Sequence, residues 1–174
     1  MNAWRIKRAV RTLAQGGLIA YPSEAVWGLG CDPWSQSAVE RLLAIKRRPV
    51  EKGLILVAAS QEQLQPLIAP LSPEQRQLLD SSWPGPVTWL LPDPHNWVPR
   101  WIKGQHGQVA VRVTDHLQLA ALCRGWGGPL VSTSANRAAQ PPARSLHEVR
   151  LTFAAQLDFL LPGLTGGLNR PTEI

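Results

Sequence analysis

Residues 130–136 read LVSTSAN, and this stretch joins an apolar strand to a polar surface. Two large apolar residues open it, and three hydroxyls and an amide follow: Ser132, Thr133, Ser134 and Asn136. In open α/β sheets, ligands gather at the carboxyl ends of strands. Hydroxyl and amide groups both donate and accept hydrogen bonds, so this set suits phosphate oxygens or the ammonium and carboxylate of an amino acid. The alternative is a turn whose hydroxyls satisfy their own backbone, and the residues alone leave both interpretations open.

Similar apolar strands recur on either side of this stretch. We expect strands at 18–21, 54–59, 86–91, 109–113, 129–133 and 158–161. Helices alternate with most of them, although the Trp-rich loop between 91 and 109 carries no obvious helix signal. The pattern predicts an α/β (α+β) fold, a single domain over 1–174, built as a three-layer sandwich with a twisted, mixed, partly parallel sheet.

Capping signals mark where the helices begin. A serine followed three residues later by Glu or Gln predicts helix starts at Ser37, Ser60, Ser72 and Ser145. The first helix should end at Gly16-Gly17, and another should begin at Asp115 and end before Gly125. Four tryptophans cluster in one region, where a role in the core or its rim is favoured over base stacking: Trp83, Trp89, Trp97 and Trp101.

Composition favours an anionic partner without identifying it. Lys and Arg number 18 and Asp and Glu number 12, which gives a formal charge of +6 and a pI near 10.2. Nucleotides, nucleic acids and acidic membrane surfaces all suit such a balance. Charged residues make up only 17% of the chain, so the excess reflects few acids as much as many bases.

The remaining class signals indicate a reduced, cytoplasmic protein. Cys31 and Cys123 are far apart and form no CxxC pair. The N-terminal helix is basic and amphipathic, which is typical of a helix packed on its own domain, and it lacks the apolar core of a secretory signal. No segment approaches the roughly 18 apolar residues of a membrane span.

A basic stretch, AIKRRPVEKG at 44–53, is the second candidate site. It carries Lys46, Arg48 and Lys52 around Pro49. Bases at a helix C-terminus complement the helix dipole, so a structural role is available. Because proline stops the helix, we expect the cations to extend into a loop, where Arg and Lys can grip phosphate. The chain contains no G-x-x-x-x-G-K-[ST], so any nucleotide site differs from a P-loop.

Two further features stand near predicted strands. Ser23 follows the strand at 18–21, and Gly28 and Gly30 come shortly after it, where they permit either close backbone approach or a turn. Arg112 interrupts an apolar strand, on the face opposite to Val109, Val111 and Val113. It is therefore either a buried anion-binding residue or a solvent-facing charge.

Other catalytic classes find little support. The four histidines follow no metal-ligand spacing, and no metal site is predicted: they are His95, His106, His116 and His147. A Ser/His/Asp triad stays open, because such residues assemble from distant positions. The chain has no G-x-S-x-G motif to support one.

Five ordered stretches together resemble a known family. They are YPSEAVWGLGCDP (21–33), KRRPVEKGLIL (46–56), WPGPVT (83–88), VAVRVTDH (109–116) and PLVSTSAN (129–136). In this order they are similar to the YrdC-like threonylcarbamoyl-AMP synthases of the short bacterial TsaC type. The resemblance implies a twisted mixed sheet around a positively charged concave surface. It also implies a nucleotidyltransferase that makes threonylcarbamoyl-AMP and pyrophosphate from L-threonine, bicarbonate or CO2, and ATP, for the N6-threonylcarbamoyladenosine modification of tRNA.

The resemblance also assigns roles to residues of this chain. The triphosphate and the developing charge would be held by Lys46, Arg48 and Lys52, with Ser134, Asn136 and Thr172 also binding ATP. Threonine would be held by Ser23, Arg112 and Ser132. Ser23 stands where many members have threonine. Mg2+ is expected to accompany ATP, because phosphoryl chemistry of this kind uses it to bridge phosphates.

Two rival interpretations accompany the enzyme. Members of the family have also been described as double-stranded RNA binders and ribosome maturation factors, so tRNA or double-stranded RNA is an expected partner beside the downstream threonylcarbamoyl-transfer proteins. The chain ends at NRPTEI, where relatives usually continue with a strand or short tail. A structural or regulatory domain without activity is therefore the third alternative.

Overall fold

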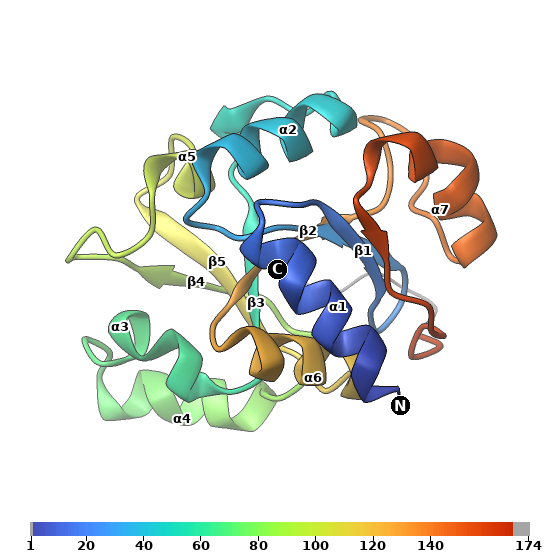
Figure 1. Cartoon of the computed structure of the whole chain (residues 1–174). Coiled ribbons are helices and arrows are strands. Elements are labelled where there is room, and N and C mark those ends of the chain that lie inside the picture. Colours follow the sequence, from blue (N-terminus) through green and yellow to red (C-terminus); the bar gives the residue numbers. More distant parts are fainter. Residues whose placement is uncertain (1, 169–174) are drawn as a thin grey trace.

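A computed structural model describes residues 2–168 and shows a seven-stranded sheet with helices on both faces (Figure 1). The strands lie in the order β4-β5-β3-β6-β2-β1-β7. Their bounds are β1 Ile19–Pro22, β2 Trp27–Gly30, β3 Ile55–Ala58, β4 Trp89–Pro92, β5 Gln108–Val113, β6 Leu130–Ser134 and β7 Phe159–Leu160. Thr172, which we expected to contact ATP, lies outside the described residues.

The sheet is mixed and partly parallel, as predicted. β1 pairs parallel with β7, and β3 pairs parallel with β5. The pairs β1–β2, β2–β6, β3–β6 and β4–β5 are antiparallel. Since β1 and β6 both run antiparallel to β2, they share one direction. The turn after β1 and the carboxyl end of β6 therefore lie at the same end of the sheet.

Helices of very different lengths cover this sheet. The α-helices are α1 Ala3–Ala14, α2 Gln36–Lys46, α3 Gln65–Ile68, α4 Pro73–Ser82, α5 Arg100–Lys103, α6 Leu117–Trp126 and α7 Leu146–Phe153. Short 3-10 helices occur at η1 Val50–Lys52, η2 Gln61–Leu64 and η3 Ala154–Gln156. No helix of residues 2–168 is long and apolar enough to cross a membrane.

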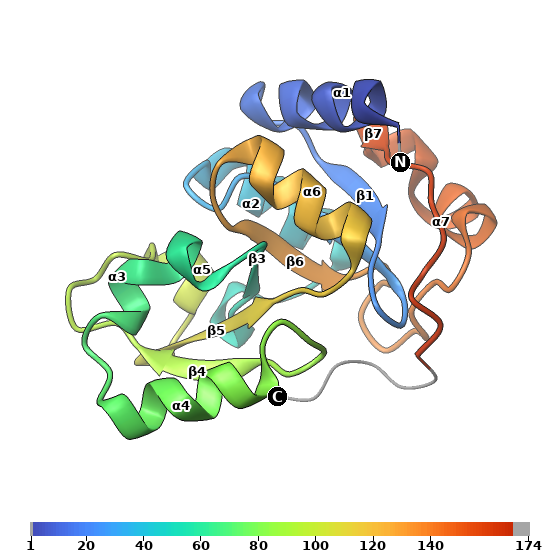
Figure 2. The ribbon, with the colours of Figure 1, turned by 90° about the horizontal axis from the view of Figure 1, so that it is seen from below.

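Neighbouring residues of one strand enter two different cores. Leu56 and Val131 pack with α2, α3, α4, α5 and α7 in the larger core. Val57 and Leu130 pack with α1 and α6 in the smaller one. The views in Figures 1 and 2 show α1 and α6 together on one side of the sheet. Because successive side chains of a strand point to opposite faces, this division confirms the predicted three-layer α/β arrangement.

Of the five predicted helix starts, three are confirmed, two of them with complete capping boxes, and two are wrong. Ser72 with Gln75 and Ser145 with Glu148 form complete capping boxes. At Ser60 a helix begins as predicted, since Ser60 is the N-cap of the 3-10 helix η2, which continues into α3, but its side chain makes no capping hydrogen bond.

At α2 the predicted start at Ser37 is wrong by two residues. Ser35 is the N-cap, and its hydroxyl accepts a hydrogen bond from the amide of Ala38. The side chain of Glu40 instead accepts a hydrogen bond from the side-chain amide of Gln36 (Nε2) at 2.8 Å. The pattern matched, but the turn after Pro33 starts the helix earlier.

At α6 the predicted cap Asp115 is also wrong. The imidazole of His116 caps the helix instead, because its Nδ1 accepts from the amide of Leu119. The helix runs on to Trp126 and ends at Gly127, whose φ of 87° is left-handed. In the tautomer that leaves Nδ1 unprotonated, a histidine ring can accept the capping hydrogen bond that we expected the carboxylate of Asp115 to accept.

Two elements were missed in the sequence. The Trp-rich loop contains the short helix α5, and residues 27–30 form the strand β2. The glycines of β2 serve packing rather than a turn. A Cβ at Gly28 would lie 2.8 Å from the ring of Tyr21, and one at Gly30 would lie 2.4 Å from the carbonyl oxygen of Val131. Close backbone approach, one of the two alternatives, is therefore the reason for both glycines.

The clustered tryptophans serve the core and its rim, as predicted. Trp83 is buried, and Trp89, Trp97 and Trp101 are partly buried against the larger core. Each of three indoles donates to a protein acceptor: Trp83 to Val87, Trp89 to Ser82 and Trp101 to Pro33.

Candidate active site

A cavity of about 260 Å³ brings together five of the nine predicted site residues. They are Ser23, Arg48, Arg112, Ser132 and Ser134, and they come from the turn after β1, the segment after α2, β5 and β6. These positions are separated by up to 111 residues in sequence, from 23 to 134. Their convergence in one cavity is therefore a property of the fold.

The hydroxyls of LVSTSAN lie on the strand rather than beyond it. β6 continues through Ser134, with Ser132 paired to Ile55 and Ser134 paired to Gly28. The predicted strand over 129–133 already included Ser132 and Thr133, and the structure extends it by one residue to Ser134. Alternation places Ser132 and Ser134 on one face of the strand, which presents both hydroxyls to the same side.

Ser23 is buried at the turn after β1, and its hydroxyl proton is already used in a hydrogen bond within the turn. Its Oγ donates to the carbonyl of Val26 at 2.7 Å. Because a hydroxyl has one proton, the remaining capacity of Ser23 is to accept hydrogen bonds. The cavity therefore has an acceptor at this point.

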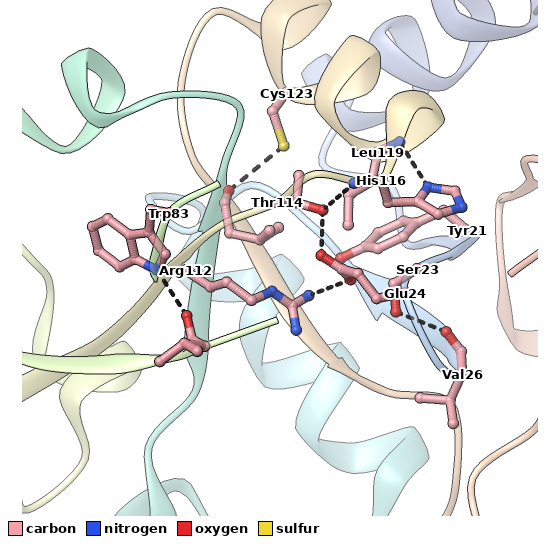
Figure 3. A network of polar contacts seen from close by, with 12 residues as sticks. Tyr21, Ser23, Glu24, Val26, Trp83, Arg112, Thr114, His116, Leu119 and Cys123 are labelled. Carbon is pink, nitrogen blue, oxygen red and sulfur yellow. Dashed lines mark hydrogen bonds and ion pairs between the residues drawn. The ribbon is translucent and has the colours of Figure 1, made fainter. Parts of the chain in front are cut away.

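Arg112 is a buried charge rather than a solvent-facing one, which settles the alternative left open by the sequence. Only 4% of it is exposed, and its Nη2 lies 3.2 Å from Oε2 of Glu24, itself 3% exposed. Thr114 donates from Oγ1 to Oε1 of the same carboxylate at 2.5 Å (Figure 3). Within the described residues the Nε of Arg112 has no hydrogen-bond partner. The cavity is thus lined by a buried cation whose position is fixed by Glu24.

Lys46 lies in the last turn of α2 and not in a loop, which corrects the expectation from Pro49. It is 4% exposed, and its ammonium donates to the carbonyls of Ser134 and Asn136 and to the Oδ1 of Asn136. Burial, and to a lesser extent the nearby charge of Arg48, lowers the pKa of Lys46 to about 8. Its three donors are all directed at the stretch 134–136, so it fixes this stretch to α2.

Asn136 completes this arrangement and faces a second hollow. Its Oδ1 accepts from the hydroxyl of Ser134 at 2.6 Å, and its Nδ2 donates to the carbonyl of Gln140 at 2.6 Å. It also lines a cavity of about 700 Å³ with Arg47, Arg137 and neighbouring residues. Lys46, Ser134 and Asn136 therefore form one polar unit between the two cavities.

Arg48 and Lys52 extend the cationic surface in the other direction. Arg48 donates to the carbonyl of Gly53 at 2.9 Å, and burial lowers its pKa. It lines the 260 Å³ cavity and also an adjoining cavity of about 460 Å³, which Lys52 and His106 share. Lys52 is exposed in η1. The basic stretch is thus folded against the cavity by its own backbone carbonyls.

The structure also defines residues that the sequence did not single out. Glu24 forms an ion pair with Arg112, Thr114 donates to Glu24, and His106 lines the same cavity as Lys52. One signal could have found Glu24. It is the first acidic residue of the chain, and a buried arginine in an apolar strand needs a counter-ion.

The residues that the structure describes give little support to a triad or a metal cage. No histidine lines the cavity of Ser23 and Ser132 among residues 2–168. In the same range, no three side chains of the metal-binding types His, Cys, Asp and Glu come together. His116 is occupied by the cap of α6 and by a contact of Nε2 with the carbonyl of Leu164 at 3.0 Å.

Comparison with known proteins places this geometry in a family. Residues 11–174 match the model Sua5_yciO_yrdC, described as Telomere recombination. The chain is 55% identical over 170 residues to the threonylcarbamoyl-AMP synthase of Cellvibrio japonicus, covering 98% of this chain and 89% of that protein. It is 54% identical to the protein of the same name from Halorhodospira halophila, with the same coverage.

A solved structure agrees with these relatives. The structure of P. abyssi Sua5 complexed with L-threonine superposes with a TM-score of 0.92 at 32% identity, over 100% of this chain. The chain spans about half of that protein, 52% of its length. With the family model matched over nearly all of its length and relatives above half identity, this chain belongs to the Sua5/YciO/YrdC family.

Proposed function

We propose that this protein is a threonylcarbamoyl-AMP synthase, a nucleotidyltransferase that acts on L-threonine, bicarbonate or CO2, and ATP. The observation that carries the proposal is the convergence of Ser23, Arg48, Arg112, Ser132 and Ser134 on one cavity. Relatives that carry this name are about half identical to the chain. In this reaction the amine of threonine adds to CO2 and loses a proton to give a carbamate. A carbamate oxygen then attacks the α-phosphorus of ATP, and pyrophosphate leaves.

The polarity of the cavity suits an amino acid in one orientation. Arg112 is the buried cation that lines the cavity beside Ser23 and Ser132, so the substrate carboxylate belongs beside its guanidinium. Ser23 retains only acceptor capacity, which matches the N–H groups of the amine or the carbamate. Ser132 lies on β6, between β2 and β3, in the same wall and completes the threonine site.

The nucleotide belongs on the opposite, cationic side. Arg48 and Lys52 are placed to neutralise the triphosphate and the departing pyrophosphate, while Ser134 and Asn136 hold the nucleotide beside the carbamate. Lys46 acts by fixing that pair to α2 and by adding positive charge to the site. Catalysis then depends on positioning and charge rather than on a covalent nucleophile. Contact of Thr172 with ATP stays a prediction.

Mg2+ is proposed to arrive with ATP as part of the substrate. The buried carboxylate of Glu24 is already engaged by Arg112 and Thr114. The donor set of the cavity is hydroxyls and cations, which fits phosphates whose oxygens carry the ion. The ion would neutralise phosphate charge, while the chain positions the reacting groups.

The test is incorporation of isotopically labelled bicarbonate. Purified protein is incubated with ATP, Mg2+, L-threonine and labelled bicarbonate, and the nucleotide product is identified by mass spectrometry. We expect an adenylate whose mass includes threonine and the labelled carbon, formed with equimolar pyrophosphate. In a control with labelled threonine and no added bicarbonate, the only carbon source is dissolved CO2, so any product must draw on it. If AMP derivatives lack the labelled carbon, the proposed reaction is wrong.

RNA binding is a second candidate, and α1 is the observation that favours it. Four cations on this helix are exposed, and no acidic residue precedes Glu24: Arg5, Lys7, Arg8 and Arg11. Phosphate backbones bind such surfaces with a steep dependence on salt. We propose tRNA or double-stranded RNA as the ligand, threonylcarbamoyl-transfer proteins as downstream partners and the cytoplasm as the location. Replacing these four residues by Gln should reduce RNA retention and its salt dependence while leaving threonine-dependent turnover intact.

A further inference from the structure

Glu24 lies behind the candidate threonine site and does not line its cavity. It is nevertheless almost fully buried, at 3% exposure, and both of its neighbours are donors. Thr114 donates to Oε1 at 2.5 Å, and the Nη2 of Arg112 lies 3.2 Å from Oε2 (Figure 3). One carboxylate oxygen therefore accepts the hydrogen bond of Thr114, and the other forms an ion pair with Arg112 and has no hydrogen-bond partner among the described residues. A buried acid in this setting has one evident partner of opposite charge, which is Arg112.

The same residue is tied to the chain from the other side. The segment 162–168 runs along its backbone, with the amide of Gly166 donating to the Ser23 carbonyl at 2.9 Å and that of Leu168 donating to the Glu24 carbonyl at 3.1 Å. A Cβ at Gly166 would approach the Glu24 carbonyl oxygen to 2.9 Å. The backbone of Glu24 is therefore fixed, and its side chain transmits that fixed position to Arg112.

We infer that Glu24 is a positioning residue, which holds the guanidinium of Arg112 at the wall of the cavity, where it meets the carboxylate of the amino-acid substrate. Thr114 fixes the rotamer of Glu24, and the segment 162–168 fixes its backbone. This inference rests on the proposed function, because it concerns the amino-acid end of that reaction. The inference goes beyond the proposed function because it assigns a role to Glu24 and Thr114, which are placed outside the substrate sites.

Glu24→Gln is the most informative change, because it keeps the size of the side chain. An amide can offer its oxygen to only one of the two donors, and its NH2 then faces the other. Arg112 loses its charged partner and its fixed orientation. We expect the KM for threonine to rise by about tenfold or more, the loss expected for one charge-assisted hydrogen bond. The KM for ATP should stay unchanged, and kcat at saturating substrates should change far less than the KM for threonine.

A matched control separates this from general damage. Asp158 is another carboxylate that binds an arginine and a backbone amide, since its Oδ2 accepts from Arg41 and from Leu18. Asp158→Asn should lower thermal stability without altering the KM for threonine. A second pair of variants covers the case in which Glu24→Gln folds poorly. Thr114→Val should raise the KM for threonine in the same direction by a smaller factor, and Thr114→Ser, which keeps the hydroxyl, should restore it.

The experiment is steady-state pyrophosphate release with each substrate varied in turn, together with calorimetric titration of threonine. A selective rise in the threonine KM and Kd for Glu24→Gln and Thr114→Val, absent in Asp158→Asn and Thr114→Ser, supports the inference. Equal changes for threonine and ATP, or unchanged threonine affinity in both variants, would overturn it while the wild-type reaction stands. Absence of threonine binding and turnover in the wild type would instead remove the proposed function itself.

Discussion

Two buried cations in this molecule, Arg112 and Lys46, are each 4% exposed but are balanced in different ways. Arg112 faces the carboxylate of Glu24, so its charge is neutralised and its direction is fixed. Lys46 faces only carbonyl and amide oxygens of Ser134 and Asn136, and no acid pairs with it among the described residues.

The difference matches the two ends of the proposed reaction. The neutralised pair gives the amino-acid end of the proposed reaction a guanidinium in a fixed position. The uncompensated ammonium leaves positive potential at the nucleotide end, where several phosphate charges are to be accommodated. Burial without a counter-ion is also why the pKa of Lys46 falls to about 8.

Arg112→Ala should have the largest effect on stability. It strands the carboxylate of Glu24 in the interior, and breaking a buried pair in this way costs about 3–5 kcal/mol. Denaturant unfolding would measure the loss. The double variant Glu24→Gln/Arg112→Ala should recover part of it, because no charge is left unpaired. If the double variant is no more stable than Arg112→Ala, the charge pairing assigned to these residues is wrong.

Lys46→Met should lower stability less than Arg112→Ala does, but it should abolish turnover. No opposite charge is stranded, so the expected loss is that of buried carbonyls left without donors, about 1–3 kcal/mol. Turnover should fall to background because Ser134 and Asn136 lose their tie to α2. This differs from a lysine on a mobile loop, whose removal would leave stability unchanged. Denaturant unfolding and pyrophosphate release on the same preparation decide between the two.

The lowered pKa of Lys46 predicts a pH dependence of ATP binding. The group is protonated below its folded pKa of about 8 and loses its charge as the pH rises through that value. The charged fraction falls about tenfold for each pH unit above the pKa, and affinity for ATP should follow it. Titrations of ATP between pH 7 and pH 9, chosen to bracket the pKa, would measure this. In Lys46→Arg, which does not titrate in this range, a similar decline would assign the dependence to another group.

Ser23→Ala should give the smallest and most selective effect. It removes one hydroxyl acceptor from the threonine end, and a hydrogen bond of this kind is worth about 0.5–1.5 kcal/mol, or about two- to tenfold in affinity. The affinity for threonine should fall, and the affinity for ATP should stay unchanged. Equal weakening of both substrates would show that the hydroxyl supports the β1 turn as a whole, through Val26, rather than the substrate.

The fold and part of the site follow from the sequence for clear physical reasons. Apolar strands alternating with capped helices are enough for a three-layer α/β arrangement, and a serine directly after a strand predicts Ser23 at the sheet end. β2 was missed because two of its four residues are glycine. Glycine is needed at both positions because the ring of Tyr21 leaves no room for a Cβ. No local pattern contains that contact.

The errors at the site have the same origin. In the sequence Lys46 looks like part of a proline-broken loop, whereas its burial depends on a segment 88 residues away. Glu24 is equally dependent on distant residues, since Thr114 lies 90 positions from it. A charged residue in a strand signals that a partner must exist, but only the fold selects which carboxylate it is.

The measurement that tests the account most directly is pyrophosphate release from ATP and bicarbonate, with and without L-threonine, at moderate salt. Release that depends on threonine and saturates with it is the predicted result, and it would make the cavity of Ser23, Arg112 and Ser132 a substrate site. Absence of release, or release of equal rate without threonine, would contradict the account.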